Sequence, residues 1–235
     1  MTARSTVSHR RMMLSALAAA AVVVLTGCGA LHPGVAADVG SVTIPRDEVD
    51  DIANVLCSAK LSGAEAQGET ASELATRLER ETALEVLLES ELSRQFGEEM
   101  GVEADEEQVA QAVAENEASI EQLPEHQRDV FRNTVRKFFG GQLILVEIGR
   151  ASLADQGQSE APDDQAIAEG QRLRAAFVEK IEVEVDPRYG TFTDGAFAAG
   201  GAALSVPASD HGLAGAKANP GSQFIAGLPA SQRCN

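Results

Sequence analysis

The chain has 235 residues, a formal net charge of −17 at neutral pH, no Trp and a single Tyr. This excess of carboxylates repels phosphate backbones and anionic lipid headgroups, so nucleic-acid binding and electrostatic docking on membranes are disfavoured. Aromatic residues make up 4% of the chain, so it lacks a platform on which sugars or bases would stack. The length suits one medium-sized domain with short appendages.

The first 27 residues have the pattern of a removable export signal. Arg4, Arg10 and Arg11 form a basic start without an acid, and an apolar run rich in Leu, Ala and Val follows over residues 14–25. The run is short for a membrane-spanning helix, which needs about 20 apolar residues, but it suits the hydrophobic part of a secretory signal. The pair Arg10-Arg11 is also a loose match to a twin-arginine export signal.

The stretch Leu25-Thr26-Gly27-Cys28 resembles the bacterial lipobox, in which the Cys thiol receives a diacylglycerol and cleavage makes that Cys the new N-terminus. The resemblance implies cleavage between Gly27 and Cys28, lipidation of Cys28 with palmitate-type chains, and a lipoprotein on the extracytoplasmic side of the cell membrane. At least two acyl chains would then anchor it, enough for stable attachment. The alternative is an ordinary secretory signal with a chance Cys.

Two further cysteines remain once Cys28 is assigned to lipid. Because an exported chain meets an oxidising compartment, Cys57 and Cys234 are predicted to pair as a disulfide across a long loop. The alternative is two free thiols, one in a helix and one in the tail.

Apolar residues repeat at helical spacing through most of the remaining chain. Pro45 and the acids after it predict a helix start, Gly97 is expected to close the second helix, and Gly140-Gly141 marks either a kink in the fourth or a close approach of another backbone. The fold class expected is mainly α, a bundle of about five amphipathic helices with a small β element and an irregular Gly/Ala-rich tail. The expected segments are a signal peptide over 1–27, a tether over 28–37, a helical domain over 38–190 and a low-complexity tail over 191–235; within the domain, β segments cover about 38–44 and 181–185 and helices about 45–60, 70–96, from 105, 124–148 and 163–180.

No catalytic residue, metal site or cofactor is predicted. Three of the four His residues fall in the signal, the tether and the tail, and only His126 is expected at the start of a helix. A zinc site needs several ligands at short spacing, and neither a nucleophile-elbow motif nor a phosphate-binding loop is present in the sequence. The sequence therefore favours a protein that is not an enzyme.

Two stretches resemble the family of SurA N-terminal-like and PrsA-like extracytoplasmic chaperones and foldases. The first is Val39-Gly40-Ser41-Val42-Thr43-Ile44 before an acidic helix start, and the second is Gly101-Val102-Glu103-Ala104-Asp105-Glu106-Glu107-Gln108-Val109. The resemblance covers about residues 38–150. Full-length members carry a parvulin isomerase module of about a hundred residues after the helical part, whereas only about a dozen residues separate the fourth and fifth predicted helices here.

The resemblance implies a membrane-anchored lipoprotein of the bacterial cell envelope that binds unfolded or secreted polypeptides between its helices without catalysis. Two alternatives stay open. One is an envelope scaffold lipoprotein that docks one folded partner, and the other is a degenerate peptidyl-prolyl isomerase.

Overall fold

Helices make up most of the computed structural model, which describes residues 33–68, 74–200, 209–217 and 219–234. All of these belong to one of the two units of the chain, Leu31–Asn235. The prediction of a mainly helical chain with a small β element is confirmed. The elements in chain order are β1 (Val35–Val39), β2 (Val42–Pro45), α1 (Arg46–Ala66), α2 (Thr76–Met100), α3 (Glu106–Glu115), α4 (Glu117–Glu121), α5 (Glu125–Asp155), α6 (Asp163–Val178), β3 (Val183–Val185), β4 (Gly190–Thr193), β5 (Ala196–Ala199), α7 (Asp210–Gly215), α8 (Ser222–Ala226) and the 3-10 helix η1 (Ala230–Gln232).

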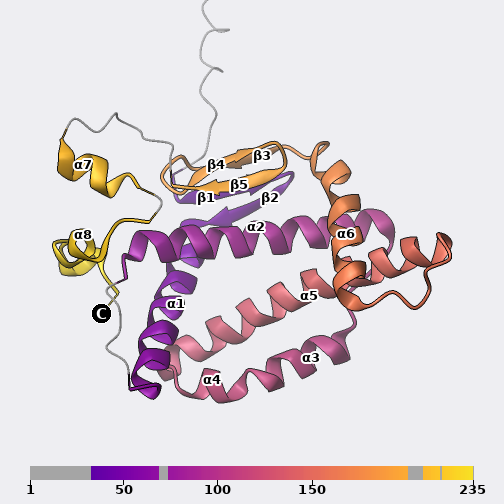
Figure 1. Cartoon of the computed structure of the whole chain (residues 1–235), viewed down its shortest axis with the longest axis horizontal. Coiled ribbons are helices and arrows are strands. Elements are labelled where there is room, and N and C mark those ends of the chain that lie inside the picture. Colours follow the sequence, from indigo (N-terminus) through magenta and orange to yellow (C-terminus); the bar gives the residue numbers. More distant parts are fainter. Residues whose placement is uncertain (1–32, 69–73, 201–208, 218, 235) are drawn as a thin grey trace, which may run out of the picture. The chain divides into compact units, whose positions relative to one another are not determined.

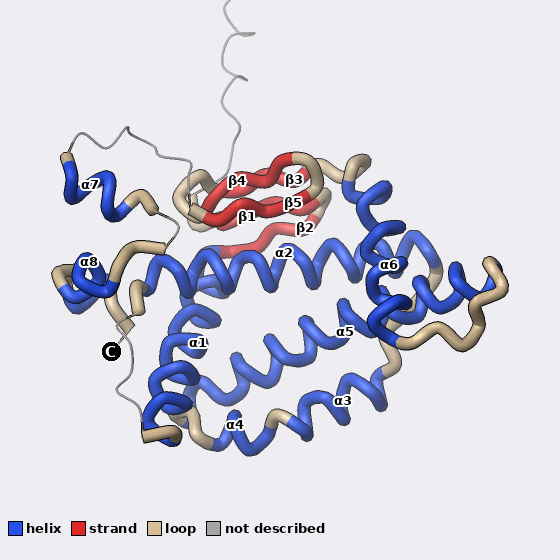
Figure 2. The backbone as a smooth tube through the Cα atoms, in the orientation of Figure 1, coloured by secondary structure: helices blue, strands red, loops and turns tan. Residues whose placement is uncertain are grey.

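The strands form a layer on one side of α2 (Figure 2). Strands β1, β2 and β3 make an antiparallel sheet in the order β2-β1-β3, and β4 pairs with β5. The expected tether over 28–37 is wrong at its end, because Val35 to Ala37 belong to β1 and Ala36 and Ala37 are fully buried. Their small side chains belong to the same buried cluster as the α2 leucines. Apolar contact with the core therefore holds this stretch in the fold, although its small residues resemble those of a linker.

Helices α1, α2 and α5 surround the core, and α2 lies between the sheet and α5 (Figure 1). Leu84, Leu88 and Leu92 of α2 are fully buried at helical spacing. Gly97 does not end this helix, contrary to expectation. A Cβ at Gly97 would lie 2.6 Å from the carbonyl oxygen of Val102, so the glycine allows a close approach inside the helix. The helix instead ends at Met100, before a glycine with a φ of 68°.

The glycine pair of α5 does not interrupt the helix, which continues to Asp155. A Cβ at Gly141 would lie 3.4 Å from the Cα of Ser90 and 3.3 Å from the Cβ of Ser93. Of the two interpretations left open by the sequence, close approach of another backbone therefore holds. The backbones of α2 and α5 meet where the side chains are smallest.

The expected irregular tail over 191–235 is wrong in part, because β4 and β5 form a hairpin there. Asp194 and Gly195 have φ values of 53° and 76°, as the two central residues of a type I′ turn require. Phe192 and Phe197 flank this turn and pack against the core. The Asp-Gly pair between apolar residues was thus a local hairpin signal in a region whose composition suggested an unstructured tail.

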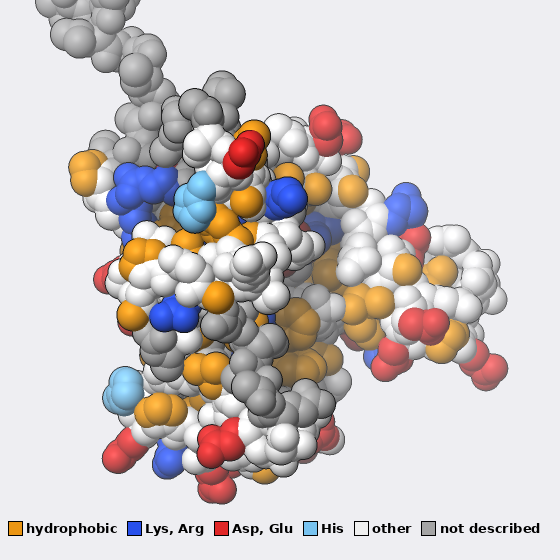
Figure 3. Space-filling model, turned by 60° about the vertical axis from the view of Figure 1, so that its left-hand side comes forward, with side chains coloured by type: hydrophobic (Ala, Val, Ile, Leu, Met, Phe, Trp, Pro, Cys, Tyr) orange, Lys and Arg blue, Asp and Glu red, His pale blue; other side chains and the backbone are white. Residues whose placement is uncertain are grey.

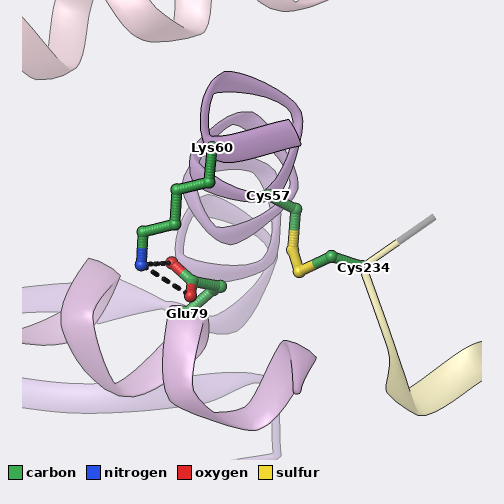
Figure 4. The surroundings of a disulfide bond; sticks show 4 residues. All are labelled: Cys57, Lys60, Glu79 and Cys234. Carbon is green, nitrogen blue, oxygen red and sulfur yellow. Dashed lines mark hydrogen bonds and ion pairs between the residues drawn. A yellow bond between two sulfur atoms is a disulfide. The ribbon is translucent and has the colours of Figure 1, made fainter. Parts of the chain in front are cut away.

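A disulfide joins Cys57 of α1 to Cys234, the pair that the sequence proposed (Figure 4). Their Cα atoms lie 5.2 Å apart, and the N–H of Cys234 donates a hydrogen bond to the carbonyl of Leu74. The last residues before the C-terminus are therefore held beside the middle of α1 and the start of α2, and α8 and η1 precede that attachment.

Candidate functional site

A groove of about 440 Å³ lies between β2, α2, α5 and the loop from α2 to α3. Each wall comes from a different part of the chain. Strand β2 forms one rim, α2 and α5 form the two long sides, and the loop closes one end. The lining residues are Val42, Thr43, Ile44, Glu48, Leu87, Ser90, Glu91, Arg94, Glu98, Val102, Glu103, Ala104, Glu106, Arg136, Lys137, Gly140, Gly141 and Ile144.

The lining includes an apolar set that is shared with the protein core. Ile44, Leu87 and Ile144 are each at most 5% exposed, and they come from the strand and from both long helices. The half-buried Val102 packs against the same cluster. A Cβ at Gly140 would meet only the Cβ of Ala104, at 3.8 Å, so the absence of a side chain leaves space on the α5 side. An apolar side chain entering here would contact the core directly.

A cluster of charged side chains on α2 lies along one side of the groove. Arg94 bonds both carboxylate oxygens of Glu91, with an Nη2–Oε1 distance of 2.6 Å, and also pairs with Glu98. Burial acts to raise the pKa of Glu91, but the hydrogen bonds from Arg94 and Gln95 and the charges of Arg94 and Lys137 outweigh it, so the pKa of Glu91 is held below its usual range. The guanidinium of Arg94 is therefore already occupied by carboxylates of its own helix.

An ion pair between Lys137 of α5 and Glu48 of α1 lies at one end of this groove. Both residues also line a second hollow of about 290 Å³ between α1 and α5, so the pair stands between the two spaces. The second hollow is bordered by Asp47 and Asp51 as well, and Ile52 and Val130 supply its apolar contacts.

The charges around the two hollows are unequal. Seven carboxylates line them and only three cations do; these are Asp47, Glu48, Asp51, Glu91, Glu98, Glu103 and Glu106 against Arg94, Arg136 and Lys137. The Arg136 guanidinium donates to the Asn133 side chain, and Arg136 forms no ion pair with any acid of the described residues. Within the described part of the chain, no ion pair is recorded for Glu103 or Glu106. The groove therefore presents net negative charge at its mouth.

Strand β2 is an edge of the three-stranded sheet, and its outer side is not covered by another described strand. The hydrogen bonds of β1 show which residues of β2 face that edge. The N–H of Gly40 donates to the carbonyl of Glu182. The N–H of Asp186 donates to the carbonyl of Ala36. Even-numbered residues of β1 therefore direct their backbone groups toward β3.

Backbone groups alternate from one side of a strand to the other. Ala37 and Val39 of β1 therefore bond to β2, where they face Ile44 and Val42. Thr43 lies between these two partners, so its N–H and C=O point to the open edge. Its side chain points away from the core, and its hydroxyl donates to Asp38 at 2.6 Å. Thr43 is thus a backbone donor and acceptor at the rim of the groove.

Cys28, which is expected to carry the lipid, and Gly27, which is expected to precede the cleavage site, lie outside the described residues. No catalytic residue was predicted, and His126 is exposed at the start of α5. Among the described residues, no three His, Cys, Asp or Glu side chains gather as a metal-binding group. Nothing in the spacing of the sequence indicated the groove, because its lining comes from residues 42 to 144 on four separate segments.

Two carboxylates at the start of α2 are buried, and no pattern in the sequence indicated this. Glu79 is 2% exposed, and each of its two carboxylate oxygens accepts a hydrogen bond of 2.7 Å from the Lys60 ammonium, beside the disulfide (Figure 4). Glu81 is 3% exposed and pairs with Arg77, which also donates to the carbonyl of Lys217. Burial raises the pKa of Glu81, although Arg77 opposes the rise. These pairs hold α1 and the C-terminal segment against α2, away from the groove.

The face toward the C-terminal segment carries acidic side chains around its outer edge, with hydrophobic ones exposed between them (Figure 3). The third hollow, between the start of α2 and the C-terminal segment, is lined by Arg77, Arg80 and Phe224 among others.

No helix in the described part of the chain has the length and apolar character needed to cross a membrane. Comparison of the chain with protein-family models, with curated proteins and with solved structures found no match.

Proposed function

We propose that this protein is a lipid-anchored, extracytoplasmic lipoprotein of the bacterial envelope that binds unfolded or secreted polypeptides without catalysis. The groove between β2, α2 and α5 is the observation that carries the proposal. It combines an apolar lining that belongs to the core, a rim of carboxylates and an open strand edge. Such a surface suits an extended, unfolded segment.

The energetics favour loose, sequence-tolerant binding. An aromatic side chain that buries about 200 Å² of apolar surface would gain about 5 kcal/mol, at roughly 25 cal/mol per Å². Ordering the segment and losing its translational freedom cost several kcal/mol in return. One or two apolar side chains in the groove therefore support weak, reversible binding, as a holding chaperone needs.

Aggregation of a denatured secreted protein tests this proposal. Light scattering after dilution from denaturant should fall when the protein is present in several-fold molar excess. The test variant is Leu87→Asp, which places a charge on the apolar lining and should lose this effect. The matched control is Glu160→Gln, which lies outside the groove and should keep it. Unchanged scattering at a tenfold excess of the wild-type protein would contradict chaperone-like binding.

The anchoring part of the proposal is tested separately with Cys28→Ser. Membrane fractionation should find the wild-type protein with the membrane and the variant in the soluble extracytoplasmic fraction. Retention of the Ser variant in the membrane fraction would contradict lipidation at Cys28.

The two alternatives predict different partners. A scaffold lipoprotein would give one saturable partner in a crosslinking pull-down, whereas a chaperone would recover many. A degenerate isomerase would catalyse cis/trans exchange in a proline peptide. Only seven residues, 156–162, separate α5 from α6. This connection is too short for an isomerase module of about a hundred residues, which favours binding by the helical part alone.

A further inference from the structure

We infer that the groove takes its polypeptide as an added strand on the open edge of β2, and that it selects segments in which Lys or Arg alternates with apolar residues. This inference rests on the proposed function and specifies the ligand of the same site. Three features carry it, namely the backbone of Thr43, the apolar lining below the strand and the surplus of carboxylates.

The backbone of Thr43 sets the mode of binding. Its N–H and C=O point away from β1, and no backbone partner is recorded for them within the described residues. Pro45, two positions on, has no N–H, and α1 begins directly after it. The edge therefore offers one complete donor-acceptor pair, so an extended segment would gain a short two-bond bridge rather than a long ladder.

The length of the edge sets the length of the ligand. Strand β2 has four residues, and a strand rises about 3.3 Å per residue, so the edge is about 13 Å long. A segment of about four residues would run along it. Since side chains of a strand alternate between its two faces, every second side chain would point down beside Ile44 and Leu87. The side chains between them would start on the solvent side, from which the long stem of a Lys or Arg can bend to the carboxylates at the mouth of the groove.

The charges set the composition of the ligand. Glu103 and Glu106 stand at the loop end of the groove without a recorded cation, and Arg94 is already bound to Glu91 and Glu98. A basic side chain next to the apolar ones would therefore meet carboxylates that have no other partner among the described residues. An acidic segment would be repelled by the same groups, which makes the groove selective by sign of charge.

The test uses peptides that contain one Trp, because the protein has none and the emission of the peptide then reports on the peptide alone. The probe is an eight-residue peptide of alternating Lys and Val with a central Trp in place of one Val. The comparison peptide carries Glu in place of Lys. We expect the basic peptide to bind at least about tenfold more tightly than the acidic one at low salt, with affinity falling as salt is added.

The strand mode is tested with peptides N-methylated at one position each, which leaves the protein unchanged. Methylation at the one position that faces Thr43 should weaken binding about tenfold, because it removes the one peptide N–H that bonds to the edge, and methylation at the other positions should leave it within twofold. The protein variant Thr43→Pro should give the same loss, and Thr43→Val, which keeps the backbone groups, should not.

The charge selection is tested with Glu103→Gln combined with Glu106→Gln. This double variant should bind the basic peptide about fivefold more weakly than the wild-type protein does. The variant Asp155→Asn combined with Glu160→Gln, which removes the same charge outside the groove, should bind it with unchanged affinity. Equal binding of the two peptides, or equal effects of N-methylation at every position, would overturn the inference while leaving polypeptide binding intact.

Two other results are distinguishable from these. No change in Trp emission with either peptide at 1 mM, a concentration chosen for weak complexes, would overturn the proposed function itself. A concentration-dependent dimer of the protein that is lost in Thr43→Pro and that peptides do not displace would overturn the inference, because a second copy would then occupy the edge.

Discussion

Lys137 of α5 pairs with Glu48 of α1, and this pair separates the groove beneath β2 from the second hollow between α1 and α5. The two residues are 89 positions apart in the sequence. The Lys137 charge also contributes to the low pKa of Glu91. A single ammonium group therefore connects carboxylates on two different helices.

Replacing Lys137 by Met should therefore affect binding more than stability. Both side chains of the pair are partly exposed, so the free energy of unfolding should change by less than about 1 kcal/mol. Removing the ammonium leaves Glu48 unpaired at the groove, and we expect the basic peptide to bind about two- to fivefold more tightly. Fluorescence titration and urea unfolding measure the two effects.

The control for that change is Lys180→Met. Lys180 pairs with Glu99 at 3.6 Å and does not line the groove, so its replacement should leave peptide affinity unchanged. Similar tightening in both variants would mean that net charge, rather than the position of Lys137, governs binding.

The pairing of Glu91 with Arg94 predicts a specific dependence of stability on pH. Because the pKa of Glu91 is lowered from 4.5 in the folded state, its ionised form adds stability above pH 4.5, and this contribution is lost as the pH falls through the lowered folded value. Glu91→Gln should destabilise the protein by about 1 kcal/mol at pH 7 and by less at pH 3.5. Urea unfolding at both pH values measures the difference between wild type and variant.

Glu98→Gln is the matched comparison, since Glu98 bonds the same guanidinium but is 64% exposed. Its replacement should cost less than about 0.5 kcal/mol. A difference between wild type and Glu91→Gln that stays constant with pH would contradict the assignment.

The crossing of α5 and α6 depends on glycine. A Cβ at Gly149 would lie 1.8 Å from the carbonyl oxygen of Ala166, and one at Gly170 would lie 2.1 Å from that of Leu145. Gly149→Ala must therefore move one helix backbone away from the other, and we expect a loss of at least about 3 kcal/mol in the free energy of unfolding.

Gly140→Ala is the matched control in the same helix. Its Cβ would meet only Ala104, at 3.8 Å, so the better helix propensity of Ala should stabilise the protein by up to about 1 kcal/mol. Chemical unfolding of both variants should therefore give changes of opposite sign. Two changes of the same sign would contradict the packing described.

The disulfide should contribute through the attachment of the C-terminal segment. Chain-entropy reasoning for a sequence separation of 177 residues gives an upper value of roughly 5 kcal/mol. Cys57→Ser combined with Cys234→Ser should lower the melting temperature and remove hydrogen-exchange protection from residues 219–234 first. Protection of α2 and α5 should remain, and equal protection of both regions in the variant would contradict a local role for the bond.

Local sequence signals predicted several elements well. Asp105 was expected to open the third helix, and its side chain accepts hydrogen bonds from the N–H groups of Glu107 and Gln108 at 2.9 and 3.1 Å. The helical spacing of apolar residues correctly indicated an amphipathic helix here, and Leu84, Leu88 and Leu92 form the buried side of α2. These signals are readable because caps and helical periodicity depend on residues at most a few positions apart.

The groove and the glycine contacts could not be predicted in this way. Gly97 was expected to end its helix, and the sequence left both a kink and a close approach open at Gly140-Gly141. Gly97 and Gly141 both lie inside helices because another segment approaches them. The spacing of charges likewise does not indicate which carboxylates are buried. Glu79 is buried beside Lys60, although its position in the sequence would equally suit an exposed face.

By itself, the sequence determined the helical class, the starts of the main helices and the cysteines available for pairing, because propensity, capping and periodicity act over neighbouring residues. Only the tertiary structure decided that Thr43 lies on an open strand edge, that Lys137 reaches Glu48 and that the acids of α2 and its following loop border an apolar groove. Those outcomes depend on contacts between residues far apart in the chain, where packing and charge pairing, not local preference, supply the free energy.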